Sequence, residues 1–145
     1  MEILEKLRVW LLSYPGWGSH TLMVEDTDGR PGSGSLHIEG FQELDSQSDV
    51  NGSTLTENRL TVLLQRITTG PEGATWLLDF HDWVQRQSVQ GDHPGLGVLP
   101  DQEKIRAIEG KRKTRYDDGS WVYQVKLQID YYTYLEGVNE NDGHF

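Results

Sequence analysis

The 145-residue chain contains no cysteine, which excludes disulfides, thiolate nucleophiles and cysteine-ligated zinc. Hydrophobic residues make up only 35% of the chain, and no apolar run approaches the length of a membrane span. Glu2 and Glu5 stand where a secretory signal peptide needs positive charge. We therefore expect a soluble protein that is made in a cytoplasm and makes no contact with a membrane.

Positive charge is also scarce, and it is unevenly placed. The chain has 13 Lys and Arg against 23 Asp and Glu, a net charge of −10. Six of the cations lie between positions 104 and 115, where Glu109 is the one acid. This balance argues against a general nucleic-acid binder, whose domain would be basic. It indicates two surfaces of opposite sign, as charge-complementary self-association needs, or an edge strand that its lysines protect from aggregation. The two interpretations are compatible.

The strongest pattern is a long β-hairpin in the last third of the chain. Its first strand is expected at residues 103–116, and Asp118-Gly119 is a preferred type I′ turn pair. From position 121 to 135 the residues alternate with a period of two, which predicts a strand with one buried face. The residues of that face are Trp121, Tyr123, Val125, Leu127, Ile129, Tyr131, Thr133 and Leu135.

A two-residue turn at this place would fix the register of the hairpin. It pairs Tyr116 with Trp121, Ile108 with Ile129, Lys111 with Lys126 and Lys113 with Gln124. Like charges directly opposite one another are unfavourable. We therefore expect the polar face of the hairpin to meet water or an acidic partner, first of all an identical neighbour.

The rest of the chain predicts two helices and further strands. Apolar residues at helical spacing predict helices over residues 2–13 and 72–87. Short strands are expected at 21–25 and 35–39. Residues 58–68 carry apolar side chains on both faces, which indicates a central strand covered on both sides. The polar residues 40–56 are interpreted as a loop.

These elements predict the fold class and the domain organisation. We expect an α+β domain over residues 1–136, with a mainly antiparallel, twisted sheet of about four to five strands. The two helices should pack on one face of the sheet, and the long hairpin should end the domain. Residues 137–145 are expected to form a disordered acidic tail.

Candidate chemical sites are few. Asp79 and Asp82 have the spacing of metal ligands on one helix, with His81 to the side, but such pairs are common on exposed helix faces. Residues 26–29 begin like a calcium loop, yet His37 stands where the final acidic ligand should be. Tyr132 and Tyr134 could stack on bases, although packing against protein is the simpler reading. No catalytic, cofactor-binding or metal-binding residue is predicted, and we expect no enzyme.

Four segments carry a family resemblance: residues 3–11 (ILEKLRVWL), 76–85 (WLLDFHDWVQ), 103–107 (EKIRA) and 123–127 (YQVKL). Together with the Gly/Pro-rich residues 91–100 they resemble small tail-terminator or tail-completion proteins, often called minor capsid proteins, of tailed phages and prophages of Gram-positive bacteria. The resemblance extends from about residue 2 to residue 136. Its motifs are structural patterns without a chemical signature.

The resemblance implies a virion structural protein of the tail or neck that is assembled in the bacterial cytoplasm. Such subunits form a homo-oligomeric ring, typically a hexamer, which caps the tail tube and joins it to the head connector. The implied partners are other copies of the chain, the tail-tube protein and head–tail connector proteins, with DNA only as cargo that passes through the lumen. No catalysis and no cofactor are implied.

The cations of the hairpin are the residues that we expect at a subunit contact or in the ring lumen. They are Lys104, Arg106, Lys111, Arg112, Lys113, Arg115 and Lys126. Three alternatives stay open. A head-closure or connector protein would bind a portal-side ring, a prophage-derived stand-alone binding module would be a monomer with a ligand, and an enzyme would hold a metal at Asp79 and Asp82.

Overall fold

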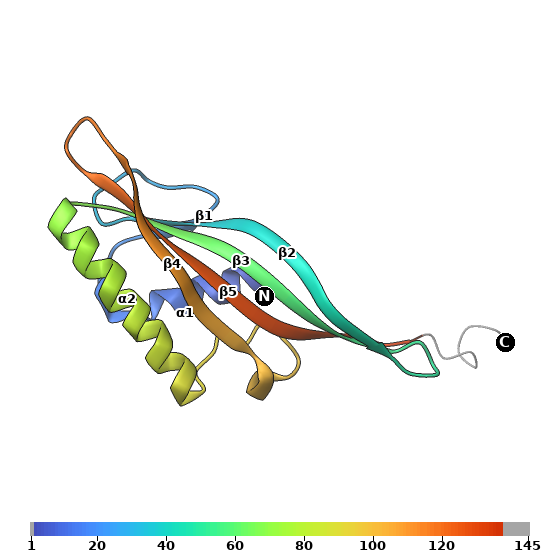
Figure 1. Cartoon of the computed structure of the whole chain (residues 1–145). Coiled ribbons are helices and arrows are strands. Elements are labelled where there is room, and N and C mark those ends of the chain that lie inside the picture. The colour runs from blue at the N-terminus through green and yellow to red at the C-terminus, as the bar shows by residue number, and fades with distance from the viewer. Residues whose placement is uncertain (1, 138–145) are drawn as a thin grey trace.

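The computed structural model describes residues 2–137 and shows an α+β fold (Figure 1). Five strands form one sheet in the order β1-β2-β3-β5-β4. Neighbouring strands are antiparallel, except that β1 and β2 are parallel. The predicted class is therefore confirmed, with two helices packed on the sheet and a β4–β5 hairpin at its end. Residues 138–145 of the predicted acidic tail lie outside the described residues.

The elements lie close to most of the predicted segments. The helices are α1 (Ile3–Leu12) and α2 (Gly70–Gln90), and short 3-10 turns lie at Pro15–Trp17 and Pro100–Gln102. The strands are β1 (Leu22–Val24), β2 (Gly34–Ser48), β3 (Thr54–Thr68), β4 (Lys104–Arg115) and β5 (Trp121–Leu135). Gly91 ends α2 with a φ of 76°, the left-handed conformation that closes a helix.

The core lies between the two helices and one face of the sheet. The predicted apolar face of β5 is buried from Tyr123 to Tyr131, but the opposite face is largely buried as well, at Val122, Gln124, Gln128 and Asp130. The side chains of the predicted face pack in one cluster with residues of β3 and of both helices. Leu135, at the far end of the same face, is 71% exposed because the strand runs on beyond the core. A strand of fifteen residues is longer than the helices can cover.

Aromatic side chains join the two helices. The rings of Trp10 and Trp83 lie 4.8 Å apart, and the ring of Tyr14 meets that of Phe80 edge to face at 5.2 Å. Such geometry adds to the free energy gained from burial alone. Both helices therefore lie on the same face of the sheet.

Strand β3 is central in the sheet, as predicted, and its second face is covered in part, because Ile67 is buried there whereas Leu63 is not fully buried. Leu60, Val62 and Leu64 are buried beneath the helices. On the opposite face Leu63 is only half-buried, and no helix of the described residues packs there. Leu63 is instead surrounded by long polar side chains of the neighbouring strands, such as Lys126, with which it pairs. An apolar residue on the second face did not require a second layer.

The prediction of a loop at residues 40–56 is wrong. These residues form most of a hairpin between β2 and β3, closed by a turn in which Asp49 accepts hydrogen bonds from the backbone of Asn51 and Ser53. Most side chains of this hairpin are polar and exposed, because it extends past the helices into water, and its few apolar residues such as Leu44 and Leu55 do not alternate regularly. Hydrophobic alternation marks a strand only where one face is buried, so the pattern was absent here.

The ends of β2, β3 and β5 form a three-stranded ribbon that we call the arm (residues 43–48, 54–58 and 131–135). Figure 1 shows it projecting beyond the helices. Polar pairs between the strands support it: the Asn58 side-chain amide donates to the Thr133 hydroxyl at 2.9 Å, and the Ser48 and Thr54 hydroxyls lie 3.2 Å apart. The arm is thus held by strand pairing with little apolar burial.

The predicted register of the β4–β5 hairpin is also wrong. The observed pairs are Arg115 with Trp121, Lys111 with Gln124, Glu109 with Lys126 and Ile105 with Ile129. Two irregularities, at Ile108 and Lys113, each insert one residue into β4 and shift the pairing. The turn contributes as well, because only Gly119 has positive φ, whereas a type I′ turn needs two such residues. Tyr116 and Ser120 close a three-residue loop instead.

Candidate functional site

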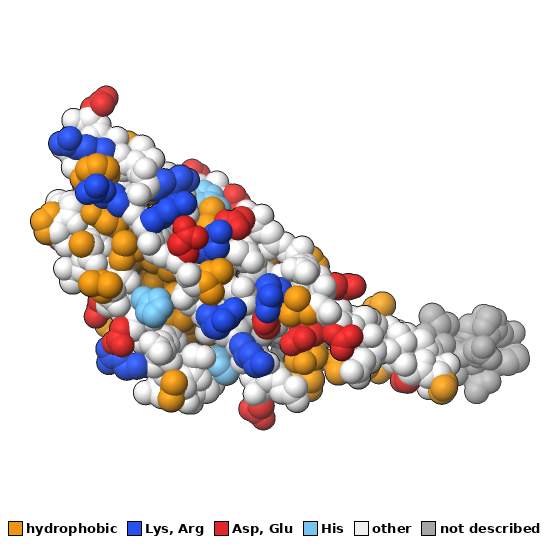
Figure 2. Space-filling model, viewed as in Figure 1, with side chains coloured by type: hydrophobic (Ala, Val, Ile, Leu, Met, Phe, Trp, Pro, Cys, Tyr) orange, Lys and Arg blue, Asp and Glu red, His pale blue; other side chains and the backbone are white. Residues whose placement is uncertain are grey.

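The basic segment predicted from the sequence forms an exposed edge of the sheet. Among residues 2–137, strand β4 pairs only with β5, and its other side has no strand partner. Its six cations are all exposed, and Figure 2 shows Lys and Arg side chains along this strand and at the hairpin tip. They are Lys104, Arg106, Lys111, Arg112, Lys113 and Arg115. We call this surface the basic edge.

Lys126, the seventh predicted site residue, does not belong to the basic edge. It lies on β5 inside the sheet, and its side chain is 25% exposed. Its ammonium group lies 3.0 Å from the Glu39 carboxylate and 3.9 Å from that of Glu109. The expected repulsion with Lys111 is absent because the three-residue loop and the bulge at Lys113 place Glu109 opposite Lys126. Lys126 is therefore neutralised within its own subunit.

The cations at the tip of the hairpin are partly held by an aromatic ring. The Arg112 guanidinium carbon lies 4.1 Å from the centre of the Trp121 ring, and that of Arg115 lies 5.8 Å from it. Such cation–π contacts are favourable and orient the side chain. Lys113 occupies the bulge, and its side chain is exposed. At the tip, the aromatic ring of Trp121 therefore holds Arg112 and Arg115, whereas the side chain of Lys113 extends into solvent.

The start of β4 is anchored by a buried carboxylate. Glu103 is 2% exposed, and its two oxygens accept hydrogen bonds from the backbone N–H groups of Gly95, Leu96 and Gly97 at 2.7–3.1 Å. These bonds satisfy three donors of a loop whose next residue, Val98, donates its N–H to the Tyr132 carbonyl of β5 at 2.9 Å. They also fix the loop against the first residue of the basic edge. Sequence analysis gave no signal for this role.

The opposite edge of the sheet is acidic, and the sequence analysis missed it. Strand β1 pairs with β2 only from Gly34 to Leu36. Beyond it, β2 carries Glu39, Glu43 and Asp45 and no Lys or Arg, and all three acids are exposed. We call residues 39–48 the acidic edge. The segment was interpreted as a loop, so its charges were never assigned to a strand.

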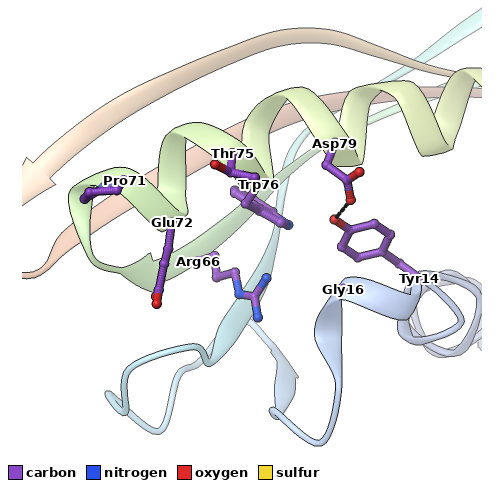
Figure 3. Close-up of a pocket in the computed structure, with 8 residues that line it drawn as sticks. All are labelled: Tyr14, Gly16, Arg66, Pro71, Glu72, Thr75, Trp76 and Asp79. Carbon is purple, nitrogen blue, oxygen red and sulfur yellow. Dashed lines mark hydrogen bonds between the residues drawn. The ribbon is translucent and has the colours of Figure 1, made fainter.

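A cavity of about 360 Å³ lies between α2 and the end of α1 (Figure 3). Arg66 points into it, stacked 4.7 Å from the centre of the Trp17 ring, and its Nε donates to the Gly32 carbonyl at 3.0 Å. Burial lowers the pKa of Arg66. The Tyr14 hydroxyl donates to Asp79, and burial followed by this carboxylate raises the pKa of Tyr14. The polar groups of the cavity therefore hold the helices together.

The metal hypothesis finds no support in the positions of its residues. Asp79 accepts the Tyr14 hydrogen bond, and Asp82 pairs with Arg86 one turn along α2. Among residues 2–137 no three His, Cys, Asp or Glu side chains are close enough to hold a metal ion. The segment that begins like a calcium loop forms a turn, in which Asp28 accepts from the backbone N–H of Arg30 and from the Thr21 hydroxyl.

A scan against protein-family models finds no matching family, and a search of curated proteins finds no matching protein. Within residues 2–137, no helix has both the length and the apolar character needed to cross a membrane.

Proposed function

We propose that the protein is a virion structural protein, a phage tail terminator that forms a homo-oligomeric ring on the tail tube and joins it to the head connector. The family resemblance of the sequence motivates this role. The observation that carries the ring is the presence of two open sheet edges of opposite charge on one small subunit.

Opposite edges suit a ring because a closed ring of more than two subunits uses two unlike patches on each subunit. The basic edge has six cations and one acid, whereas the acidic edge has three acids, of which Glu39 is paired with Lys126, and no Lys or Arg of its own. A basic edge repels another basic edge, so symmetric dimers are disfavoured. Unlike edges attract, and each subunit keeps one edge free for the next.

The arm supports a role in a larger assembly. It projects from the body and exposes Val50, Tyr134 and Leu135 near its end. A narrow ribbon with apolar side chains at its tip is poorly explained by the stability of the subunit alone, since it buries little. It is suited to contact a neighbouring protein, and the resemblance names the tail-tube protein and the connector proteins as candidates.

Reconstitution tests the proposal. The protein is measured by native mass spectrometry at low ionic strength, and then mixed with polymerised tail-tube protein and imaged by electron microscopy. We expect a closed oligomer that binds one end of each tube. A strict monomer in both conditions would overturn the proposal. A ring that binds the portal-side connector but never the tube would reassign the protein to head closure.

A further inference from the structure

We propose that copies of this chain join by continuing the β-sheet from one subunit to the next. The first half of β4, residues 104–110, would pair with residues 39–45 of β2 in the neighbouring copy. This inference rests on the proposed ring, and it names the two strands that form each contact. The occupant of each open edge is thus a second copy of the same chain.

Both strands have free backbone on their outer sides. In the described part of the chain, β4 pairs only with β5, and β2 beyond Leu36 pairs only with β3. The Glu25 carboxylate accepts from the backbone N–H of Ile38 at 2.7 Å and so ends the stretch that is already covered. From Glu39 onward the outward N–H and C=O groups of β2 are available to a partner strand.

The directions of the strands agree with such pairing. Along the sheet, β2, β3, β5 and β4 alternate in direction. If neighbouring subunits keep the same orientation, as they do in a ring, β4 of one copy runs antiparallel to β2 of the next. The alternation then continues across the contact without interruption.

The charges align after a small displacement. Pairing through β5 and β3 places Lys104 level with Gln42 of the same subunit. Because Leu44 is a bulge, Asp45 lies two levels beyond Gln42, so a neighbour displaced by two levels, or about 7 Å along the strands, brings its Asp45 level with Lys104. The same displacement brings its Glu43 level with Ile105, one level from both Lys104 and Arg106. A displacement between neighbouring strands is also what closing a sheet into a ring requires.

The same displacement brings two exposed apolar residues near each other. Phe41 is 59% exposed on the acidic edge, and Ile108 is 43% exposed on the basic edge. After the shift Phe41 lies level with Ala107, next to the bulged Ile108. An aromatic side chain and a β-branched side chain are a favourable pair across two strands. The contact thus combines charge attraction with apolar burial.

The tip of the hairpin stays outside this contact. At the same displacement, Lys113 and Arg115 lie beside the part of the neighbouring β2 that β1 already covers. The basic edge therefore divides into a half that meets the next copy and a tip that is left for another partner. This division distinguishes the inference from a general attraction between charged surfaces.

Exchange of the charges tests the inference in the full-length protein. One variant carries Lys104→Glu and Arg106→Glu, a second carries Glu43→Lys and Asp45→Lys, and a third combines all four. The first two change the net charge by four in opposite directions, and the third restores it to −10. Two controls make the same changes elsewhere: Lys113→Glu with Arg115→Glu at the tip, and Glu2→Lys with Asp92→Lys on exposed positions away from both edges.

The oligomer mass of each variant is measured by light scattering at low salt. Circular dichroism verifies that each variant is folded. We expect each edge variant to weaken ring assembly at least tenfold, the combined variant to restore it, and both controls to retain it. If the natural chain forms a ring but the edge variants do so equally well, or the combined variant fails to recover, the edge pairing is wrong and the ring stands. If the natural chain forms no ring, the proposed function fails as well.

Discussion

The two open edges of the sheet are protected in the same way but with opposite charge. Each carries exposed charged side chains and two irregularities in its strand pairing. Charged residues and bulges are the usual means by which an edge strand avoids pairing with another copy of itself. Because one edge is basic and the other acidic, this protection acts against like edges and leaves the unlike pair open. The same charged residues can therefore prevent the pairing of like edges and favour the pairing of unlike edges.

The largest expected effect comes from removing the anchor of the basic edge. Glu103→Ala leaves three loop N–H groups without their acceptor, and burial prevents water from replacing it fully. We expect the free energy of unfolding to fall by about 3 kcal/mol, measured by urea denaturation. Glu103→Gln keeps one acceptor oxygen and should cost less. Equal stability of the alanine variant and the natural protein would show that this carboxylate does not fix the start of β4.

The salt dependence of assembly should distinguish a contact between charged edges from a purely apolar contact. Raising the salt from about 0.05 M to about 1 M shortens the Debye length from over 10 Å to about 3 Å. We expect this change to weaken assembly roughly tenfold, followed by sedimentation velocity. Assembly that is unchanged or strengthened in high salt would assign the contact to apolar residues such as Phe41 and Ile108.

A smaller effect should distinguish cations held within the subunit from free ones. Arg112→Ala removes the contact with the Trp121 ring and should lower the free energy of unfolding by about 0.5–1 kcal/mol. Lys113→Ala removes the same charge from an exposed side chain without an aromatic contact and should change stability less. The comparison uses thermal unfolding together with tryptophan fluorescence. Equal effects of both changes would mean that the aromatic ring of Trp121 does not hold the tip of the β4–β5 hairpin.

The smallest effect concerns the border of the acidic edge. The backbone N–H of Ile38, followed by His37, lowers the pKa of Glu25 below its ordinary value of 4.5. A lowered pKa means that the capping hydrogen bond persists as pH falls through 4.5 and is lost only below it. The Ile38 amide resonance should therefore titrate with a midpoint under 4.5, and Glu25→Gln should abolish this titration. A midpoint at or above 4.5 would show that the cap is absent.

Elements with a buried face could be predicted from the sequence. The alternation of residues 121–135 and the helical spacing of residues 72–87 both reflect packing against the core, so both segments were placed within a few residues. The arm could not be predicted in this way. Residues 43–48 are held by strand pairing and polar contacts, and neither leaves a periodic pattern of apolar residues.

Only the basic edge of the candidate site could be predicted from the sequence, for a related reason. The cations of β4 are conspicuous in an acidic chain. The acids at 39–45 could be assigned to an edge strand only after the structure showed that β2 continues past Glu39. Bulges have no sequence signature here. A three-residue loop and one inserted residue at Lys113 placed Glu109 opposite Lys126 and turned an expected repulsion into an ion pair within the subunit.

Mixing the two edge variants tests the central claim most directly. The variant with reversed β4 charges has two acidic edges, and the variant with reversed β2 charges has two basic edges. Native mass spectrometry at low ionic strength should show each alone as a monomer. An equimolar mixture should give closed oligomers with equal numbers of both chains, because each basic edge then meets only acidic ones. Monomers that persist in the mixture, or oligomers of random composition, would contradict the account.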